Sequence, residues 1–94
     1  MRIRWLDQAV ADLVNVRSFI AQQNPAAASE TAQKIRQAAA ILADYPAAGR
    51  AGRVPNTREL VISGTPYLLP YRVRGEAIEI LRVLYSARRW PEEF

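Results

Sequence analysis

The side chains in this sequence that are best suited to chemistry are arginines. Twelve of the 13 basic residues are arginine, and the remaining one is Lys34. A guanidinium group is planar and permanently charged, and it can hold a phosphate or a carboxylate through two parallel hydrogen bonds. Eight of the arginines lie between residues 50 and 89: Arg50, Arg53, Arg58, Arg72, Arg74, Arg82, Arg88 and Arg89.

The net charge of this arginine-rich half indicates which classes of molecule it could bind. Residues 50–89 hold three acids, Glu59, Glu76 and Glu79, so the span carries a net charge of +5, against +4 for the whole chain. Such a charge is typical of a surface that meets nucleic acid or an acidic protein. The alternative is a solvated face with a few ion pairs. Arg82 interrupts an apolar run, and we expect it to pair with Glu59 or Glu79.

The most distinctive local feature is the sequence Arg88-Arg89-Trp90, just beyond the last apolar run. Two guanidinium groups beside an indole suit phosphate contact combined with base stacking. Arginine and tryptophan are also frequent anchors of protein interfaces. The structural alternative is that Trp90 packs on the edge of a sheet and the two arginines have no role.

The rest of the catalytic inventory is small. The chain has no cysteine and no histidine, which removes thiolate and imidazole metal ligands and the commonest general base. It also has no glycine-rich phosphate loop, and we expect no cofactor and no metal. Phosphodiester cleavage by positioning and charge stabilisation is the one reaction that arginine, tyrosine and glutamate could support.

The first half of the chain predicts a strand and a helical hairpin. Residues 2–5 alternate polar and apolar, as in a half-buried strand. From Asp7 to about Asn24 apolar residues recur every three or four positions, as in an amphipathic helix. Asn24-Pro25 then predicts the start of an alanine-rich helix that ends near Asp44. The two helices should pack antiparallel, because neither apolar stripe is buried alone. The stripes are Leu6, Ala9, Leu13, Val16 and Ile20, and Ala28, Ala32, Ile35, Ala39 and Leu42.

The second half predicts strands. Residues 47–57 are expected to form a loop, followed by strands over 59–62, 67–73 and 77–85. The last of these is almost continuously apolar and should be the central strand. Pro70 cannot donate to a ladder, so it implies an edge position or a bulge. If alternation holds in the strand over 67–73, Arg72 lies on the face opposite Tyr71.

Together these elements predict an α+β fold in the order β-α-α-β-β-β. An N-terminal strand is followed by an antiparallel helical hairpin packed on one face of a mainly antiparallel β-sheet. Ninety-four residues suffice for one domain, spanning 1–94. No apolar stretch is long enough to span a membrane, and no signal-peptide pattern is evident, so we expect a cytoplasmic protein.

This order, with three stretches of sequence, resembles the RelE/ParE superfamily of toxins from bacterial type II toxin–antitoxin modules. The stretches are Glu59-Leu60-Val61-Ile62, residues 67–73, and the run from Ile78 to Pro91. The last is the most specific, with its Ile-Leu-Arg-Val-Leu core, its Ala-Arg and its closing Trp-Pro. Tyr85 stands where relatives commonly have histidine. The resemblance covers essentially the whole chain.

The resemblance implies one of two mechanisms. RelE-type members cut mRNA in the ribosome with loop lysines, an arginine after a strand aromatic, a second arginine after the last strand and a C-terminal tyrosine. Here the loop has arginines only, Leu68 follows Tyr67, and Phe94 stands at the tyrosine position, while Arg88 matches the second arginine. ParE-type members lack that set and poison DNA gyrase by binding it. The sequence is more similar to the ParE branch.

The resemblance therefore implies a non-catalytic toxin that binds DNA gyrase and is neutralised by a cognate acidic antitoxin that folds on binding. The alternatives are a RelE-like mRNA endonuclease and a non-toxic basic interaction module. No membrane contact is expected, and direct contact with nucleic acid stays open. The residues expected to face the target are Arg53, Arg58, Arg88, Arg89 and Trp90. Those expected to face the antitoxin are Leu13, Val16, Ile20, Arg72 and Arg74.

Overall fold

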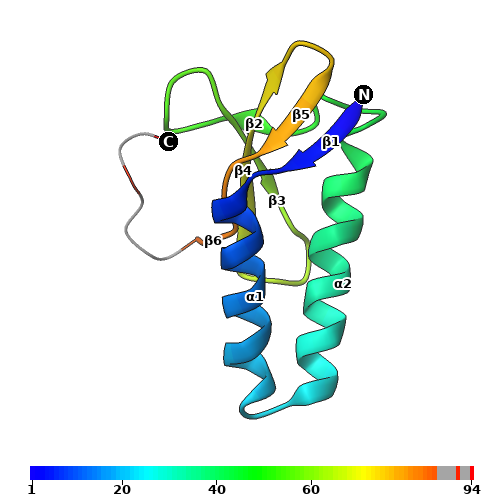
Figure 1. Ribbon diagram of the computed structural model, residues 1–94, viewed down its shortest axis with the longest axis vertical. Coiled ribbons are helices and arrows are strands. Elements are labelled where there is room, and N and C mark those ends of the chain that lie inside the picture. The colour runs from blue at the N-terminus through cyan, green and yellow to red at the C-terminus, as the bar shows by residue number, and fades with distance from the viewer. Residues whose placement is uncertain (87–90, 92–93) are drawn as a thin grey trace.

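The computed structural model describes residues 1–86, 91 and 94, and it has the expected α+β architecture (Figure 1). An N-terminal strand, a helical hairpin and a set of mainly antiparallel strands follow one another along the chain. The elements are β1 (Arg2–Trp5), α1 (Asp7–Ala21), α2 (Pro25–Ile41), β2 (Arg50–Ala51), β3 (Arg58–Val61), β4 (Tyr67–Arg74), β5 (Ala77–Ile80) and β6 (Leu84–Tyr85). Within the described residues, neither helix has the length and apolarity needed to cross a membrane.

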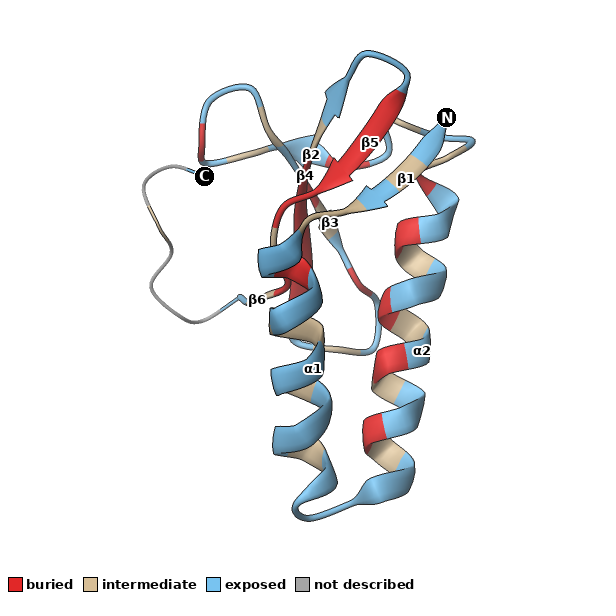
Figure 2. Ribbon diagram, in the orientation of Figure 1, coloured by how far each residue is buried: buried red, intermediate tan, exposed pale blue. Residues whose placement is uncertain are grey.

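The helical hairpin forms where the sequence predicts it. Asn24 caps α2, since its side-chain oxygen accepts a hydrogen bond from the backbone N–H of Ala27 at 3.0 Å, and Pro25 occupies the first helical position. Both helices end a few residues before the predicted points. The buried residues of α2 lie along one side of the helix (Figure 2), and with Leu42, which follows its last residue, they are the predicted stripe: Ala28, Ala32, Ile35, Ala39 and Leu42.

The strands form one sheet, in the order β1-β5-β4-β3-β2, with β6 paired to β4. Only the β1–β5 pair among the described strands is parallel. Helix residues such as Ala9 and Ile35 share one core cluster with Leu69, Tyr71 and Ile78 of the sheet. The helical hairpin therefore covers one face of the sheet, as expected. The opposite face has no helix on it among the described residues, and we refer to it as the open face.

Two predictions about the strands are wrong. The stretch 47–57 is not wholly a loop, because Arg50 and Ala51 pair with Glu59 and Arg58 as β2. The apolar run 77–85 is not one central strand, since it breaks after Ile80 and resumes as β6, and β4 holds the middle of the sheet. Hydrophobicity reports burial, and the segment between β5 and β6 is also buried, so apolarity alone could not reveal the break.

Pro70 explains where the run breaks. It lies inside β4, which is paired on both sides, so of the two expected alternatives the edge position does not apply. Between the pairs Tyr71–Ile80 and Leu68–Leu84, β4 advances three residues and its partner advances four. The extra residue is a β-bulge, which confirms the other expectation. The Pro70 carbonyl accepts a hydrogen bond from the N–H of Leu81 at 2.9 Å. In a strand the nitrogen and the carbonyl of one residue point to the same neighbour, so the Pro70 nitrogen, which has no hydrogen, also faces the bulge.

Tyr71 ties the sheet to the segment that follows α2. Its buried hydroxyl donates to the Pro46 carbonyl and accepts the Gly49 N–H, each at 2.8 Å. A Cβ at position 49 would lie 2.6 Å from a ring carbon of Tyr71, so only glycine allows this approach. This contact sets the start of β2.

Replacing Tyr71 with phenylalanine should lower the free energy of unfolding by about 2 kcal/mol, because the partly buried Pro46 carbonyl and the buried Gly49 N–H lose their partner. Urea unfolding followed by circular dichroism measures the change. Tyr45→Phe is the matched control, since Tyr45 is 66% exposed, and it should shift the value by less than about 0.5 kcal/mol. Equal stabilities for Tyr71→Phe and the parent protein would contradict the anchoring role.

Candidate functional site

Two buried carboxylates organise the arginines of the open face. Glu59 and Glu79 are 2% and 5% exposed, and they are the charged residues found buried among the described residues. Both face away from the helices, since Glu59 lies opposite Pro70 and Glu79 opposite Arg72 in the ladder. Burying a carboxylate is costly unless it is paired and hydrogen-bonded, so each must be surrounded by cations.

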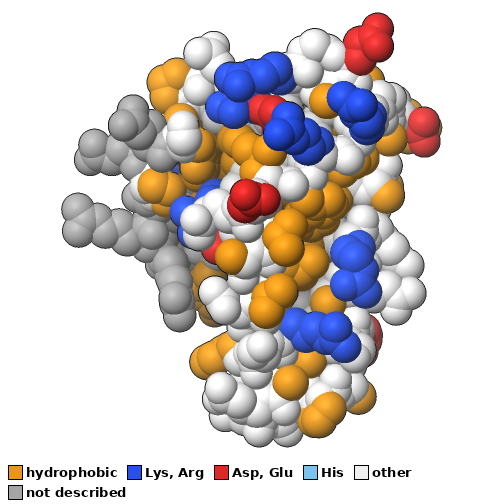
Figure 3. Space-filling view, viewed as in Figure 1, with side chains coloured by type: hydrophobic (Ala, Val, Ile, Leu, Met, Phe, Trp, Pro, Cys, Tyr) orange, Lys and Arg blue, Asp and Glu red, His pale blue; other side chains and the backbone are white. Residues whose placement is uncertain are grey.

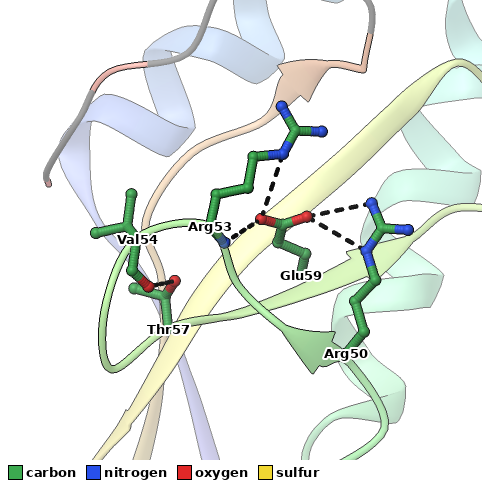
Figure 4. A network of polar contacts seen from close by, with 5 residues as sticks. All are labelled: Arg50, Arg53, Val54, Thr57 and Glu59. Carbon is green, nitrogen blue, oxygen red and sulfur yellow. Dashed lines mark hydrogen bonds and ion pairs between the residues drawn. The ribbon is translucent and has the colours of Figure 1, made fainter.

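Glu59 binds the segment that contains β2 (Figure 4). One carboxylate oxygen accepts hydrogen bonds from Arg50, through Nε at 3.4 Å and Nη2 at 3.2 Å. The other accepts the backbone N–H of Arg53 at 2.7 Å and lies 3.8 Å from its Nε. The turn beyond is closed by a 2.6 Å hydrogen bond from the Thr57 hydroxyl to the Val54 carbonyl. Glu59 thus fixes the positions of the guanidinium groups of Arg50 and Arg53.

Glu79 gathers three arginines from two neighbouring strands. Arg72 Nε donates to it at 2.7 Å, and the guanidinium groups of Arg4 and Arg74 lie 3.5 and 3.8 Å from it. The hydrogen bond from Arg72, followed by the charges of Arg72, Arg74 and Arg4, lowers the pKa of Glu79 below its ordinary value of 4.5, against the opposing effect of burial. One negative charge therefore faces three positive ones.

Arg82 pairs with neither of the expected glutamates. It forms a two-pronged ion pair with Asp12 of α1, with Nε at 2.6 Å and Nη2 at 3.1 Å, and Asp12 also accepts the Val83 N–H at 3.0 Å. The expectation failed because Glu59 and Glu79 face the open side of the sheet, whereas Arg82 reaches the helix side. The β-bulge between Ile80 and Leu84 redirects the chain, so that Arg82 lies beside α1.

A groove that the sequence did not predict lies beside this ion pair. It has a volume of about 810 Å³, and α1 and β6 both contribute to its walls. Phe19 is 66% exposed and Tyr85 is 40% exposed, and the rings of Tyr67 and Tyr85 meet edge to face with centroids 5.6 Å apart. The bulge places Tyr85 opposite Tyr67. The lining residues are Asp12, Asn15, Val16, Phe19, Tyr67, Arg82, Val83, Leu84, Tyr85 and Pro91.

The predicted target-facing residues fall in two places. Arg53 lies beside Glu59, and Arg58 donates from Nη1 to the Gly49 carbonyl at 2.8 Å, so both help hold the same segment. Arg88, Arg89 and Trp90 lie outside the described residues. Arg58 lies opposite Tyr71 in the ladder and therefore on the helix side of the sheet, whereas Arg53 lies with Glu59 on the open face, so the structure does not bring these two arginines onto one surface.

The predicted antitoxin-facing residues lie on both sides of the sheet. Leu13, Val16 and Ile20 are half-buried against the core, while Arg72 and Arg74 are on the open face with Glu79. The exposed apolar residues of α1 are instead Val10, Val14 and Phe19. These three lie outside the main apolar stripe of the helix, and apolar residues off the stripe are the sequence signal that marks such an exposed face.

The described residues show no cluster of three or more His, Cys, Asp or Glu that could hold a metal ion. Asp12 is engaged by Arg82 and Val83, and both buried glutamates are engaged by arginines. The arrangement is suited to binding through charge and through an aromatic groove.

Comparison with known proteins agrees with this architecture. The family model described as "ParE toxin of type II toxin-antitoxin system, parDE" matches residues 3–90. A Sinorhizobium fredii protein named "Putative toxin Y4kP" is 41% identical over 91 residues, which cover 97% of this chain and 94% of that protein. Toxin RelE2 of Caulobacter vibrioides is 37% identical over 87 residues, 93% and 97% of the two chains.

Among solved structures, a chain of the "Chromosomal ParDE TA system from P. aeruginosa" superposes with a TM-score of 0.82 at 31% identity, covering 88% of this chain and 92% of that one. The fold and these matches define the class, toxins of type II toxin–antitoxin systems with the RelE/ParE fold. Within that class the chain belongs to the ParE toxin family, and such a toxin has an antitoxin partner.

The lowered pKa of Glu79 predicts a loss of stability in acid. A carboxyl group whose pKa is lower in the folded than in the unfolded protein stabilises the fold above its unfolded pKa, and this contribution disappears as pH falls through the folded value. The free energy of unfolding, measured by urea titration at a series of pH values from neutral to below 4.5, should therefore fall across the acid part of the range.

Arg72→Gln should make that fall shallower, because it removes the largest cause of the shift. Arg17→Gln, which removes an exposed charge from α1, is the matched control and should keep the steep dependence. The cause assigned to Arg72 is wrong if the two variants have the same pH profile.

The ion pair of Asp12 with Arg82 should contribute to the stability of the fold. Asp12→Asn should lower the free energy of unfolding by about 2 kcal/mol, because three charge-assisted hydrogen bonds are weakened and Arg82 loses its counter-charge. Asp44→Asn, at an exposed position beyond α2, should change it by less than about 0.5 kcal/mol. Thermal and urea unfolding of both variants would measure this, and similar values would contradict a structural ion pair.

Proposed function

We propose that this toxin acts by binding DNA gyrase and that it performs no chemistry of its own. In this proposal it is present in the cytoplasm with its antitoxin and becomes active when the antitoxin is lost. The growth arrest then comes from a blocked enzyme on DNA.

The single observation that carries the proposal is the burial of Leu68 within the sheet. At the position after the strand aromatic, where the RelE-type set has a catalytic arginine, the chain has a leucine that is 3% exposed and packed into the sheet. A side chain in that place can neither hold a phosphate nor stabilise charge in a transition state. The fold uses this position for packing.

The other positions of that set support the same reading. The loop carries arginines in place of lysines, and Arg50 and Arg53 are occupied with the buried Glu59. Phe94 has no hydroxyl to take part in proton transfer. Asp12, the carboxylate found in the groove lining among the described residues, accepts three hydrogen bonds and has little capacity left to act as a base.

The groove is the proposed place of the antitoxin. Its half-buried floor includes Val16, and exposed Phe19 and Tyr85 supply aromatic anchors of the kind that dominate protein interfaces. An amphipathic helix of the antitoxin fits between α1 and β6 in the helix-in-groove manner. Leu13 and Ile20 then contribute mainly by shaping this face, because they already pack on the core.

The target-facing residues of the proposal are Arg53, Arg58, Arg88, Arg89 and Trp90. Arg53 belongs to the segment held by Glu59 and Tyr71, and Arg58 of β3 donates a hydrogen bond to that segment, so their positions are set in advance of binding. Preorganised arginines lose less conformational freedom on binding.

A supercoiling assay with purified gyrase and toxin tests the proposal. The toxin should inhibit supercoiling, and Arg88→Ala/Arg89→Ala should raise the half-inhibiting concentration about tenfold or more, equivalent to ~1.4 kcal/mol. Arg17→Ala/Arg36→Ala removes the same charge from the helices and should leave inhibition unchanged. Full gyrase activity in a large excess of folded toxin would rule out gyrase as the target.

The ribonuclease alternative has its own test, and the name of the relative RelE2 is the reason to perform it. Primer extension on translating ribosomes should show no toxin-dependent cleavage. Cleavage that disappears in Arg88→Ala would replace the gyrase proposal with an RNA-cleaving mechanism.

A further inference from the structure

Four arginines form a regular array at one end of the open face. The ladder aligns β1, β5 and β4 in two rows, Arg2–Ala77–Arg74 and Arg4–Glu79–Arg72. Residues that lie opposite each other in neighbouring strands share a face, and so do residues two apart on one strand. The outer positions of both rows are therefore arginines, and the inner positions are Ala77 and Glu79. We call these four arginines the arginine array.

Arg2, Arg4 and Arg74 of the array are exposed, the Arg72 side chain is 24% exposed, and the array is only partly neutralised. The side chains of Arg4 and Arg74 are each 65% exposed, and the side chain of Glu79 beneath them is 6% exposed. Arg72 Nε takes the 2.7 Å hydrogen bond to Glu79. A carboxylate has two oxygens and one charge, whereas each guanidinium has five N–H donors, so most of the donors remain available to a ligand. Figure 3 shows basic side chains around an acidic one over β1 and β5.

The open face concentrates the charge of the protein. Together with the pairing of Arg50 and Arg53 to Glu59, the array brings six guanidinium groups and two carboxylates onto this face. Their net charge is +4, equal to that of the whole chain. The ligand that this face favours is therefore a polyanion.

The side chains beside the arginine array indicate which class of polyanion it would bind. Protein interfaces need apolar or aromatic anchors, and the remaining side chains in the two rows are the buried Ala77 and Glu79. Single-stranded nucleic acid is held by stacking on aromatic side chains, but Tyr67, Tyr71 and Tyr85 face the helix side. A set of cations on one side of a sheet, with no aromatic side chain in its two rows among the described residues, suits the phosphate backbone of a duplex.

We propose that the arginine array binds the sugar–phosphate backbone of double-stranded DNA without regard to sequence. This inference deepens the proposed function, because gyrase works on duplex DNA, and a toxin that holds the same duplex would bind a gyrase–DNA complex more tightly than gyrase alone. The binding itself requires no gyrase. Arg72 and Arg74, expected above to face the antitoxin, are here DNA contacts.

Fluorescence anisotropy of a labelled mixed-sequence duplex, titrated with the full-length toxin between about 50 and 200 mM salt, tests the proposal. The logarithm of the association constant should fall against the logarithm of salt concentration with a slope of about −3.6, if each of four arginines meets one phosphate. The same oligonucleotide in single-stranded form should bind more weakly.

Arg4→Gln/Arg74→Gln should make the slope shallower by about 1.8 and weaken binding about 60-fold at roughly 0.1 M salt. The pair was chosen because Arg72, the closest partner of Glu79, stays in place to support the fold. Arg17→Gln/Arg36→Gln removes two charges from the helices and should weaken binding less than about twofold. Circular dichroism confirms folding of both variants.

Three results would overturn the inference: no duplex binding at the lowest salt, tighter binding of the single strand, or equal effects of the two double variants. Its failure is distinguishable from that of the proposed function. A toxin that inhibits gyrase but does not bind the free duplex contradicts only the arginine array. A toxin that binds the duplex with the predicted slope but leaves gyrase active contradicts only the gyrase proposal.

Discussion

The pairing of two buried carboxylates with arginines is the interaction on which the open face of this toxin depends. Glu59 and Glu79 each lie within a strand, on the open face of the sheet, and each is almost completely buried. Their burial is tolerable only because guanidinium groups surround them. The same pairing draws arginines from separate strands and from the β2 segment into fixed positions. Structural ion pairs thus produce a preorganised basic surface.

The two faces of the sheet consequently have different chemistry. The helix side carries the apolar core and, at its edge, a groove lined with aromatic residues beside the Asp12–Arg82 ion pair. The open side carries the positive charge. A toxin of a type II toxin–antitoxin system has an antitoxin partner, and in the proposal above the aromatic groove receives the antitoxin while the open side stays available to other ligands. The bulge opposite Pro70 contributes to this division, because it turns Tyr85 to the helix side.

Much of the fold could be predicted because local rules agree with it. The Asn24-Pro25 cap, the alanine stripe of α2 and the alternation in β4 each follow from short-range physics. The assignment of Arg72 to the face opposite Tyr71 was correct for this reason. The partner of Arg82 could not be predicted, because Asp12 is 70 residues away in sequence and only the packing of α1 beside the bulge brings them together. The groove was missed for the same reason, since its walls come from distant segments.

The sequence by itself determined the two helices, the approximate positions of most strands, the family and the sign of the charge, because helix caps, hydrophobic periodicity and composition are local properties of the chain. Only the tertiary structure decided which arginines are committed to Glu59, Glu79 and Asp12 and how the remaining hydrogen-bond donors are arrayed. That decision depends on strand order and register, which place Arg4 of β1 next to Glu79 of β5 across 75 residues of sequence. A chain in which arginine is so frequent has many possible ion pairs, and the burial of two glutamates in one sheet selects among them.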